Sequence, residues 1–213
     1  MHNLVIYGGS FDPVHYGHLK TALAVQQALN FDRFLFLPCK TPLLKKTTMA
    51  SSAQRLDMLA LALQPYPRFA IDSQEIERDT PSYMVDTLQN IRRLGGQNLA
   101  ITLLIGMDTF LQLPQWHAWQ QLMDLSHLLV IHRPGAVEKA SIAPVLQALL
   151  ITRETHDKKE LLTQPYGKIY RLDAGQYDIS STWLRQQINQ GLSIENYVPA
   201  AVNQYIKEQA LYR

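Results

Sequence analysis

Two histidines, His15 and His18, follow a glycine-rich turn near the start of the chain and lie three residues apart. A helix that opens near Tyr16 would place both imidazoles on one face, where they can donate hydrogen bonds. The first N–H groups of such a helix attract an anion, and glycines let the backbone approach it closely. The turn residues that we expect to bind a phosphate chain are Gly8, Gly9, Ser10 and Phe11.

A histidine pair at this spacing has two other interpretations, a capped helix with exposed imidazoles and a metal site. The sequence offers no obvious third metal ligand, and a glycine turn precedes the pair. We therefore favour phosphate binding over both.

A second candidate segment lies near the other end of the chain, where Ile179-Ser180-Ser181-Thr182 precedes Arg185. Ser180 is a good N-cap residue for a helix. The first-turn N–H groups and the hydroxyls of Ser181 and Thr182 would then face an anion, and Arg185 would extend toward it. Taken alone, an arginine here would more often be a solvated charge on a helix.

The elements that must position these residues alternate between strands and helices along the chain. Apolar runs that do not alternate with polar residues predict buried strands, which is typical of a parallel sheet covered on both faces. We predict an α/β fold, a Rossmann-like doubly wound parallel sheet with helices on both faces and a small C-terminal helical extension. The predicted strands cover residues 4–7, 34–37, 69–71, 99–105, 127–131 and 168–172, and the predicted helices lie around 19–29, 56–63, 85–91, 142–150, 181–190 and 199–209.

Start signals for two of these helices can be read directly. Ser51 and Gln54 have the spacing of a capping box, and Ser82 is placed to cap the helix that carries Val85. We expect one domain over residues 1–213, with its helical part from about residue 174. The segments 8–18, 38–46, 106–108 and 132–135 each follow a predicted strand end, where ligands bind in such folds, so we expect a single site.

Composition excludes several classes of protein. Of 213 residues, 46% are hydrophobic and 18% are charged, so the chain can bury a core and is not disordered. A net charge of +2 argues against a nucleic-acid partner. Cys39 is the single cysteine, which rules out an intramolecular disulfide and a multi-cysteine zinc site. The apolar run at 99–105 is too short for a membrane span and the one at 4–7 too short for a signal peptide, which favours the cytoplasm.

The pattern Gly-Gly-x-Phe-Asp-Pro-x-His-x-Gly-His at residues 8–18 resembles the opening motif of the nucleotidyltransferases that carry a His-x-Gly-His sequence. Residues 179–185 resemble the second motif of that superfamily, Ile-Ser-x-Thr-x-x-Arg. Two such motifs at opposite ends of one chain make a chance match very improbable. The resemblance implies that His15 and His18 contact the triphosphate of ATP and that Arg185 holds its outer phosphates.

The middle of the chain resembles the bacterial nicotinate mononucleotide adenylyltransferases within that superfamily. The similar segments are Pro81-Ser82-Tyr83, Gly106-Met107-Asp108 followed by Trp116, and His132-Arg133-Pro134-Gly135. The nicotinate nucleotide would therefore contact Tyr83, Met84, Asp108, Trp116, Arg133 and Lys45. Trp116 taken alone would more often be a core residue.

Two departures from that family pattern affect these residues. Met84 occupies a position where the family usually has threonine, and Leu44 one where it usually has histidine. The contact of that histidine cannot be carried over, and Lys40, Lys45 or Lys46 is a candidate for supplying the positive charge instead.

The reaction implied by the resemblance is ATP plus nicotinate mononucleotide giving deamido-NAD and pyrophosphate, with Mg²⁺ accompanying ATP. The alternatives are a transferase acting on phosphopantetheine or on nicotinamide mononucleotide, and a nucleotide-binding regulatory module without turnover. An RNA-binding protein would need a basic stripe with interleaved aromatics, which the chain lacks. The sequence leaves a homo-oligomer open.

Overall fold

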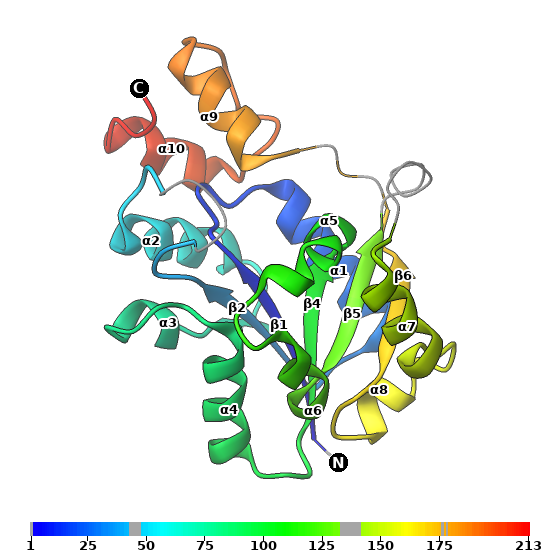
Figure 1. Cartoon of the computed structure of the whole chain (residues 1–213). Helices are drawn as coiled ribbons and strands as arrows, with labels where there is room; N and C mark the ends of the chain where they lie inside the picture. The colour runs from blue at the N-terminus through cyan, green and yellow to red at the C-terminus, as the bar shows by residue number, and fades with distance from the viewer. Residues whose placement is uncertain (1, 43–47, 133–141, 176, 178) are drawn as a thin grey trace. The chain divides into compact units, whose positions relative to one another are not determined.

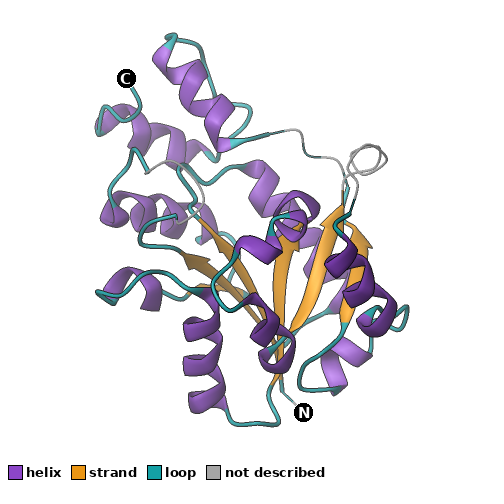
Figure 2. Cartoon of the chain, in the orientation of Figure 1, coloured by secondary structure: helices purple, strands orange, loops and turns teal. Residues whose placement is uncertain are grey.

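Six strands form one sheet in the computed structural model, which describes residues 2–42, 48–132, 142–175, 177 and 179–213. The strand order is β3-β2-β1-β4-β5-β6, which is the doubly wound order, and the sheet is parallel. Figure 2 shows the strands in orange. The strands are β1 (Asn3–Gly9), β2 (Arg33–Pro38), β3 (Phe69–Ile71), β4 (Ala100–Gly106), β5 (His127–His132) and β6 (Ile169–Asp173). The α/β class and the doubly wound parallel sheet are therefore confirmed.

The longer helices were all predicted, the first three of them from apolar residues at helical spacing. They are α1 (Tyr16–Leu29), α2 (Ser52–Leu63), α4 (Met84–Gly95), α7 (Pro144–Arg153), α9 (Ser181–Asn189) and α10 (Ala200–Glu208). The shorter ones were not predicted, because one or two turns are too few to show a period. They are α3 (Gln74–Glu77), α5 (Met107–Leu111), α6 (Leu122–Leu125), α8 (Glu160–Thr163) and the 3₁₀ turns η1 (Leu113–Gln115) and η2 (Trp119–Gln121).

The chain divides into two compact units that interleave in sequence. The first comprises Met1–Gly8, Ala24–Leu35 and Tyr83–Gln176, and the second Gly9–Leu23, Phe36–Ser82 and Tyr177–Arg213. The expectation of a single domain over the whole chain stays a prediction.

The first unit is built around buried strands, which lie side by side in Figure 1. β1 pairs in parallel with β4, β4 with β5, and β5 with β6. Every residue of β4 before its terminal glycine is buried, which explains why this run shows no polar alternation. Ile6 of β1 and Leu103 of β4, which are register partners, are fully buried.

The second unit includes the C-terminal helices. α10 packs against α2, and the hydroxyl of Tyr205 donates a hydrogen bond to Oδ2 of Asp57 at 2.7 Å across that contact. The predicted capping box of α2 is present, because Ser51 Oγ accepts from the N–H of Gln54 while Gln54 Oε1 accepts from the N–H of Ser51. Within the described part of the chain, no helix is long and apolar enough to cross a membrane.

Candidate active site

The turn after β1 folds back on itself. Phe11 has a φ of +49°, and its ring is 1% exposed and packs at 5.6 Å from the ring of Phe36. A Cβ at Gly9 would lie 3.0 Å from Cζ of Phe11, so a larger residue would push this ring by a few tenths of an ångström. Gly9 therefore makes space for a core side chain, in addition to any approach of a ligand.

His15 and His18 lie together at the start of α1, as their spacing predicted. Their rings stack with centroids 3.7 Å apart, and His15 is 4% exposed while His18 is half-buried. The N–H of His15 donates to Nδ1 of His18 at 3.3 Å, so His18 takes the role that Glu or Gln has in a capping box. Because Nδ1 accepts this bond, a neutral His18 carries its proton on Nε2, and that N–H is a donor.

Gly17, between the two histidines, is required by the ring of His15. A Cβ at Gly17 would lie 2.9 Å from Cε1 and Nδ1 of that ring, a separation that real Cβ atoms essentially never show. The glycine of the His-x-Gly-His sequence therefore has a packing reason that spacing alone did not reveal.

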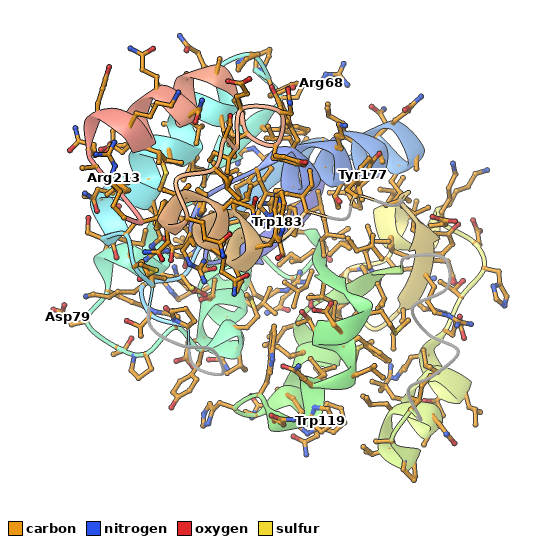
Figure 3. All side chains as sticks on the ribbon, turned by 90° about the horizontal axis from the view of Figure 1, so that it is seen from above. Arg68, Asp79, Trp119, Tyr177, Trp183 and Arg213 are labelled. Atoms are coloured by element: carbon orange, nitrogen blue, oxygen red, sulfur yellow. The ribbon has the colours of Figure 1, made fainter. Side chains whose placement is uncertain are left out.

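Helix α9 begins where predicted, with Ser180 as its N-cap. The hydroxyl of Ser180 accepts from the N–H of Trp183 at 3.2 Å. The hydroxyl of Ser181 donates to the carbonyl of Pro13 at 2.9 Å, which ties the first turn of α9 to the segment that contains the histidines. The Trp183 side chain, labelled in Figure 3, packs edge-on against the ring of Tyr197 with centroids 4.7 Å apart.

Arg185 lies one turn into α9 and contacts the same segment. Its guanidinium donates to the carbonyl of Asp12 at 2.6 Å and to the hydroxyl of Thr182 at 3.2 Å. It also lies 3.7 Å from the carboxylate Oδ2 of Asp12. Two motifs from opposite ends of the chain are therefore joined through Arg185.

Asp12 belongs to the opening motif, and it is a functional candidate for which no role was predicted. The residue is buried, at 2% exposure. The carboxylate accepts hydrogen bonds from the N–H groups of Met49 and Ala50, at 2.8 and 3.1 Å, and from the hydroxyl of Tyr212 at 2.7 Å. An aspartate followed by proline is typical of a turn. No local pattern predicts that its carboxylate binds residues as distant in sequence as Met49 and Tyr212.

Arg55 of α2 is the second missed residue, and its side chain is fully buried. Its guanidinium donates to the carbonyls of Ser10 and Cys39 at 2.8 Å and of Lys40 at 2.9 Å. Arg55 thus joins the loops that follow β1 and β2. A signal for it existed, because Arg55 falls on the same helical stripe as the buried Met58 and Leu59.

In the first unit, α4 begins at Met84 with Tyr83 as its N-cap, and the N-cap side chain makes no capping hydrogen bond. The prediction that Ser82 caps this helix is wrong. Its hydroxyl accepts from the N–H of Lys40 at 3.1 Å instead. The ring of Tyr83 stacks on that of His117, with centroids 4.2 Å apart.

The other predicted nicotinate contacts of the first unit are Asp108 and Trp116, which follow β4 along the chain, and Met84, which begins α4. Trp116 directly follows η1 and is half-buried, so it is not a core residue. Asp108 is exposed, and its Oδ1 lies 2.7 Å from where a Cβ of Gly106 would be, so the carboxylate folds back toward the end of β4. A Cβ at Gly8 would meet Cε of Met84 at 3.3 Å.

Lys45 and Arg133, like Leu44 and Lys46, lie outside the described residues, so their predicted roles stay predictions. Lys40, the other candidate for the missing charge, is engaged. Its ammonium donates to the carbonyl of Arg78 at 2.9 Å and pairs with Asp79 at 3.1 Å.

Residues 6–187 match the model of the cytidylyltransferase-like family, so the chain belongs to that family. A Legionella pneumophila (strain Lens) protein described as a probable nicotinate-nucleotide adenylyltransferase is 48% identical over the full length of both chains. One from Serratia proteamaculans with the same description is 41% identical over 98% of this chain and 94% of its own. The chain is accordingly a member of the nicotinate-nucleotide adenylyltransferases, enzymes of NAD biosynthesis.

Solved structures agree on the fold. The Plasmodium falciparum nicotinic acid mononucleotide adenylyltransferase complexed with NaAD matches with a TM-score of 0.72 at 19% identity, covering 100% of this chain and 98% of that one. A putative nicotinate-nucleotide adenylyltransferase from Vibrio parahaemolyticus matches with a TM-score of 0.64 at 15% identity, covering 100% and 96%.

Proposed function

We propose that this adenylyltransferase divides its reaction between two sets of residues. The reaction transfers AMP from ATP to nicotinate mononucleotide and gives deamido-NAD and pyrophosphate. The phosphate-site residues would hold ATP together with the turn Gly8–Phe11. These residues are His15, His18, Ser180, Ser181, Thr182 and Arg185. The pyridine-site residues would hold the nicotinate nucleotide, and they are Tyr83, Met84, Asp108 and Trp116, together with Arg133 and Lys45.

The observation that carries this proposal is the junction of the two motifs. Ser181 and Arg185 donate hydrogen bonds to the carbonyls of Pro13 and Asp12. The N-terminal turn of α9 therefore lies against the segment that leads into the His-x-Gly-His sequence. A helix N-terminus, a guanidinium and an imidazole N–H donor in one place suit a polyphosphate.

The proposed step is an in-line displacement at the α-phosphorus. A phosphate oxygen of the mononucleotide forms the new P–O bond, and the bond to the bridging oxygen of the β-phosphate breaks, so pyrophosphate leaves with the electron pair. Nε2–H of His18 stabilises the charge on the α-phosphate, and the stacked, buried His15 holds His18 in place. Arg185 and the first turn of α9 bind the departing phosphates. Catalysis comes from positioning and charge stabilisation, without a covalent protein intermediate.

We expect Mg²⁺ to enter with ATP, bound by phosphate oxygens and water. Across the described residues, no group of three His, Cys, Asp or Glu side chains is arranged to hold a metal ion. The carboxylate beside Arg185 belongs to Asp12 and is occupied by two backbone N–H groups and a tyrosine hydroxyl. A metal that the nucleotide carries would offset the charge of the phosphates.

The pyridine ring would stack on the half-buried Trp116. Its carboxylate would meet the first-turn N–H groups of α4, whose N-cap side chain makes no capping bond. Oriented N–H groups favour a carboxylate over a neutral amide, independent of the side chain at Met84.

A pyrophosphate-release assay with ATP, Mg²⁺ and a panel of acceptors tests the proposal. We expect turnover of nicotinate mononucleotide to exceed that of nicotinamide mononucleotide and to far exceed that of phosphopantetheine. Arg185→Ala should reduce it strongly, whereas Arg68→Ala, at an exposed position labelled in Figure 3, should not. Equal use of phosphopantetheine would contradict the substrate assignment, and nucleotide binding without turnover of any acceptor would indicate a regulatory module.

A further inference from the structure

The carboxylate of Asp12 is a buried junction of the second unit. Oδ1 accepts from the N–H of Ala50 and the hydroxyl of Tyr212, while Oδ2 accepts from the N–H of Met49 and faces Arg185 at 3.7 Å. At 2% exposure this group depends on protein donors, because losing one leaves a buried charge undersolvated. Its orientation is therefore set by these partners.

Tyr212 is the penultimate residue of the chain, next to Arg213, which Figure 3 labels. Its side chain is 5% exposed, and its backbone has a φ of +65°, in the left-handed region that non-glycine residues rarely adopt. Burial and the neighbouring Asp12 carboxylate raise the pKa of the Tyr212 hydroxyl, so it stays protonated and remains a donor. The end of the chain thus turns inward to deliver one hydroxyl to Asp12.

Arg185 shares Asp12 with Tyr212. It donates to the Asp12 carbonyl, and its guanidinium lies 3.7 Å from Oδ2, which is ion-pair distance but too long for a hydrogen bond. A guanidinium pairs most strongly with a carboxylate when both oxygens are available to it. Because Tyr212 and Ala50 occupy Oδ1, Asp12 holds Arg185 by its backbone and leaves the guanidinium able to bind another anion.

We propose that Tyr212 is a positioning residue for the reaction, acting through Asp12 on Arg185. The inference rests on the proposed role of Arg185 in binding the outer phosphates of ATP. Removing the Tyr212 hydroxyl leaves Oδ1 short of a donor, and Arg185 moves to supply it. The guanidinium then pairs with Asp12 at the expense of the phosphates. Tyr212 thereby determines how strongly the Asp12 carboxylate competes with the substrate phosphates for Arg185.

The first test compares Tyr212→Phe with Tyr205→Phe. The control removes the same hydroxyl from another C-terminal tyrosine that also donates to a carboxylate at 2.7 Å, in the contact between α10 and α2. We expect Tyr212→Phe to lower kcat/KM for ATP about tenfold, in the range for a hydrogen bond to a charged group, with KM for nicotinate mononucleotide unchanged. Binding of inorganic pyrophosphate, measured by calorimetry, should weaken equally. Tyr205→Phe should leave these values within about twofold.

The second test is a double-mutant cycle with Arg185→Ala. If Tyr212 acts through Arg185, Tyr212→Phe has no further effect on kcat/KM in the Arg185→Ala background. An equal loss in both backgrounds, or a loss in Tyr205→Phe as large as in Tyr212→Phe, would overturn the inference. A fully active Arg185→Ala enzyme would instead overturn the proposed role of Arg185. An impaired Arg185→Ala enzyme beside a normal Tyr212→Phe enzyme would overturn the positioning role alone.

Tyr212→His provides a conservative rescue, because its ring keeps an N–H that can donate to Asp12. We expect it to recover part of the activity that Tyr212→Phe loses. If Tyr212→Phe does not fold, kcat/KM for ATP is compared between Tyr212→His and Tyr205→His instead. A loss no larger in Tyr212→His than in Tyr205→His would then overturn the inference. A loss confined to thermal stability, with kcat/KM per folded molecule unchanged, would show that Tyr212 is merely structural.

Discussion

His18 combines a structural contact with a chemical one in a single imidazole. Nδ1 accepts the N–H of His15 and so closes the first turn of α1, while the proton of the neutral ring is fixed on Nε2. The stacked ring of His15, itself buried, prevents His18 from rotating freely. A donor held in this way loses little entropy when a phosphate arrives, which is the condition for effective charge stabilisation.

We predict that His18→Ala lowers kcat by on the order of 10²-fold, the usual effect of removing one fixed donor to developing charge. His18→Gln should retain more activity, because glutamine at this helix position can accept the backbone N–H and still offer an amide N–H. Steady-state kinetics and thermal melts of both variants provide the measurement. Equal loss in the two would indicate that an imidazolium charge, not a neutral donor, is needed. Full activity of His18→Ala would show the residue to be structural.

Trp116 allows a similar test of the pyridine subsite. Its side chain is half-buried, and a flat aromatic surface stacks on a pyridine ring with about 1–3 kcal/mol. We predict that Trp116→Ala raises KM for nicotinate mononucleotide about tenfold or more, with little change in KM for ATP. Trp119→Ala is the matched control, since Trp119 is also half-buried and begins η2 three residues further on. Unfolding, or equal weakening of both substrates, would show that Trp116 supports the core instead.

At the scale of elements, local signals located the long helices and failed where tertiary contacts intervene. The capping box of α2 and the Ser180 N-cap of α9 are as predicted, because both involve residues within one turn of each other. Ser82 had the right residue type beside α4, yet its hydroxyl bonds to Lys40 of a distant loop. The interaction that decided its role is therefore invisible to a local pattern.

Helix α2 deserves a stability test because it carries Arg55, which joins the loops after β1 and β2. We predict that Ser51→Ala lowers the free energy of unfolding by about 1 kcal/mol, the typical cost of losing an N-cap hydroxyl. Ser51→Asp, which keeps an acceptor and suits the positive end of the helix dipole, should stay near the wild-type value. Urea denaturation of the three proteins measures the difference. A Ser51→Asp protein as unstable as Ser51→Ala would argue against the cap as the cause.

At the scale of the whole molecule, the fold class and the two motifs could be predicted from the sequence. The roles of the charged residues that join distant segments could not. Asp12 meets Tyr212 and Arg185 from the far end of the chain. Buried Arg92 of α4 donates to the carbonyls of Leu125 and Pro165. In each case a buried charged side chain forms hydrogen bonds with buried polar groups. Its partners are set by the topology of the fold and not by the spacing of residues in the sequence. A charged residue on the apolar stripe of a helix, such as Arg92, can be recognised as unusual in the sequence. Its contacts can be seen only in the folded structure.

His127, the first residue of β5, gives the fold a predictable response to acid. Its ring is fully buried, Nε2–H donates to the carbonyl of Gln164 at 2.8 Å, and Nδ1 accepts from the N–H of Lys168 at 3.1 Å. Burial is the main cause that lowers the pKa of His127 from 6.5 to about 4, because the charged ring is poorly solvated there.

Between these two pKa values the unfolded chain binds the proton and the folded chain does not. The contribution of neutral His127 to stability is therefore complete above pH 6.5 and is lost as the pH falls toward 4, up to about 3 kcal/mol. We predict that urea unfolding at pH 7, 6 and 5 shows a steeper loss of unfolding free energy in the wild type than in His127→Gln, which cannot take up this proton. His156→Gln, at an exposed histidine, should follow the wild type. Parallel pH profiles for wild type and His127→Gln would show that other groups govern the acid response.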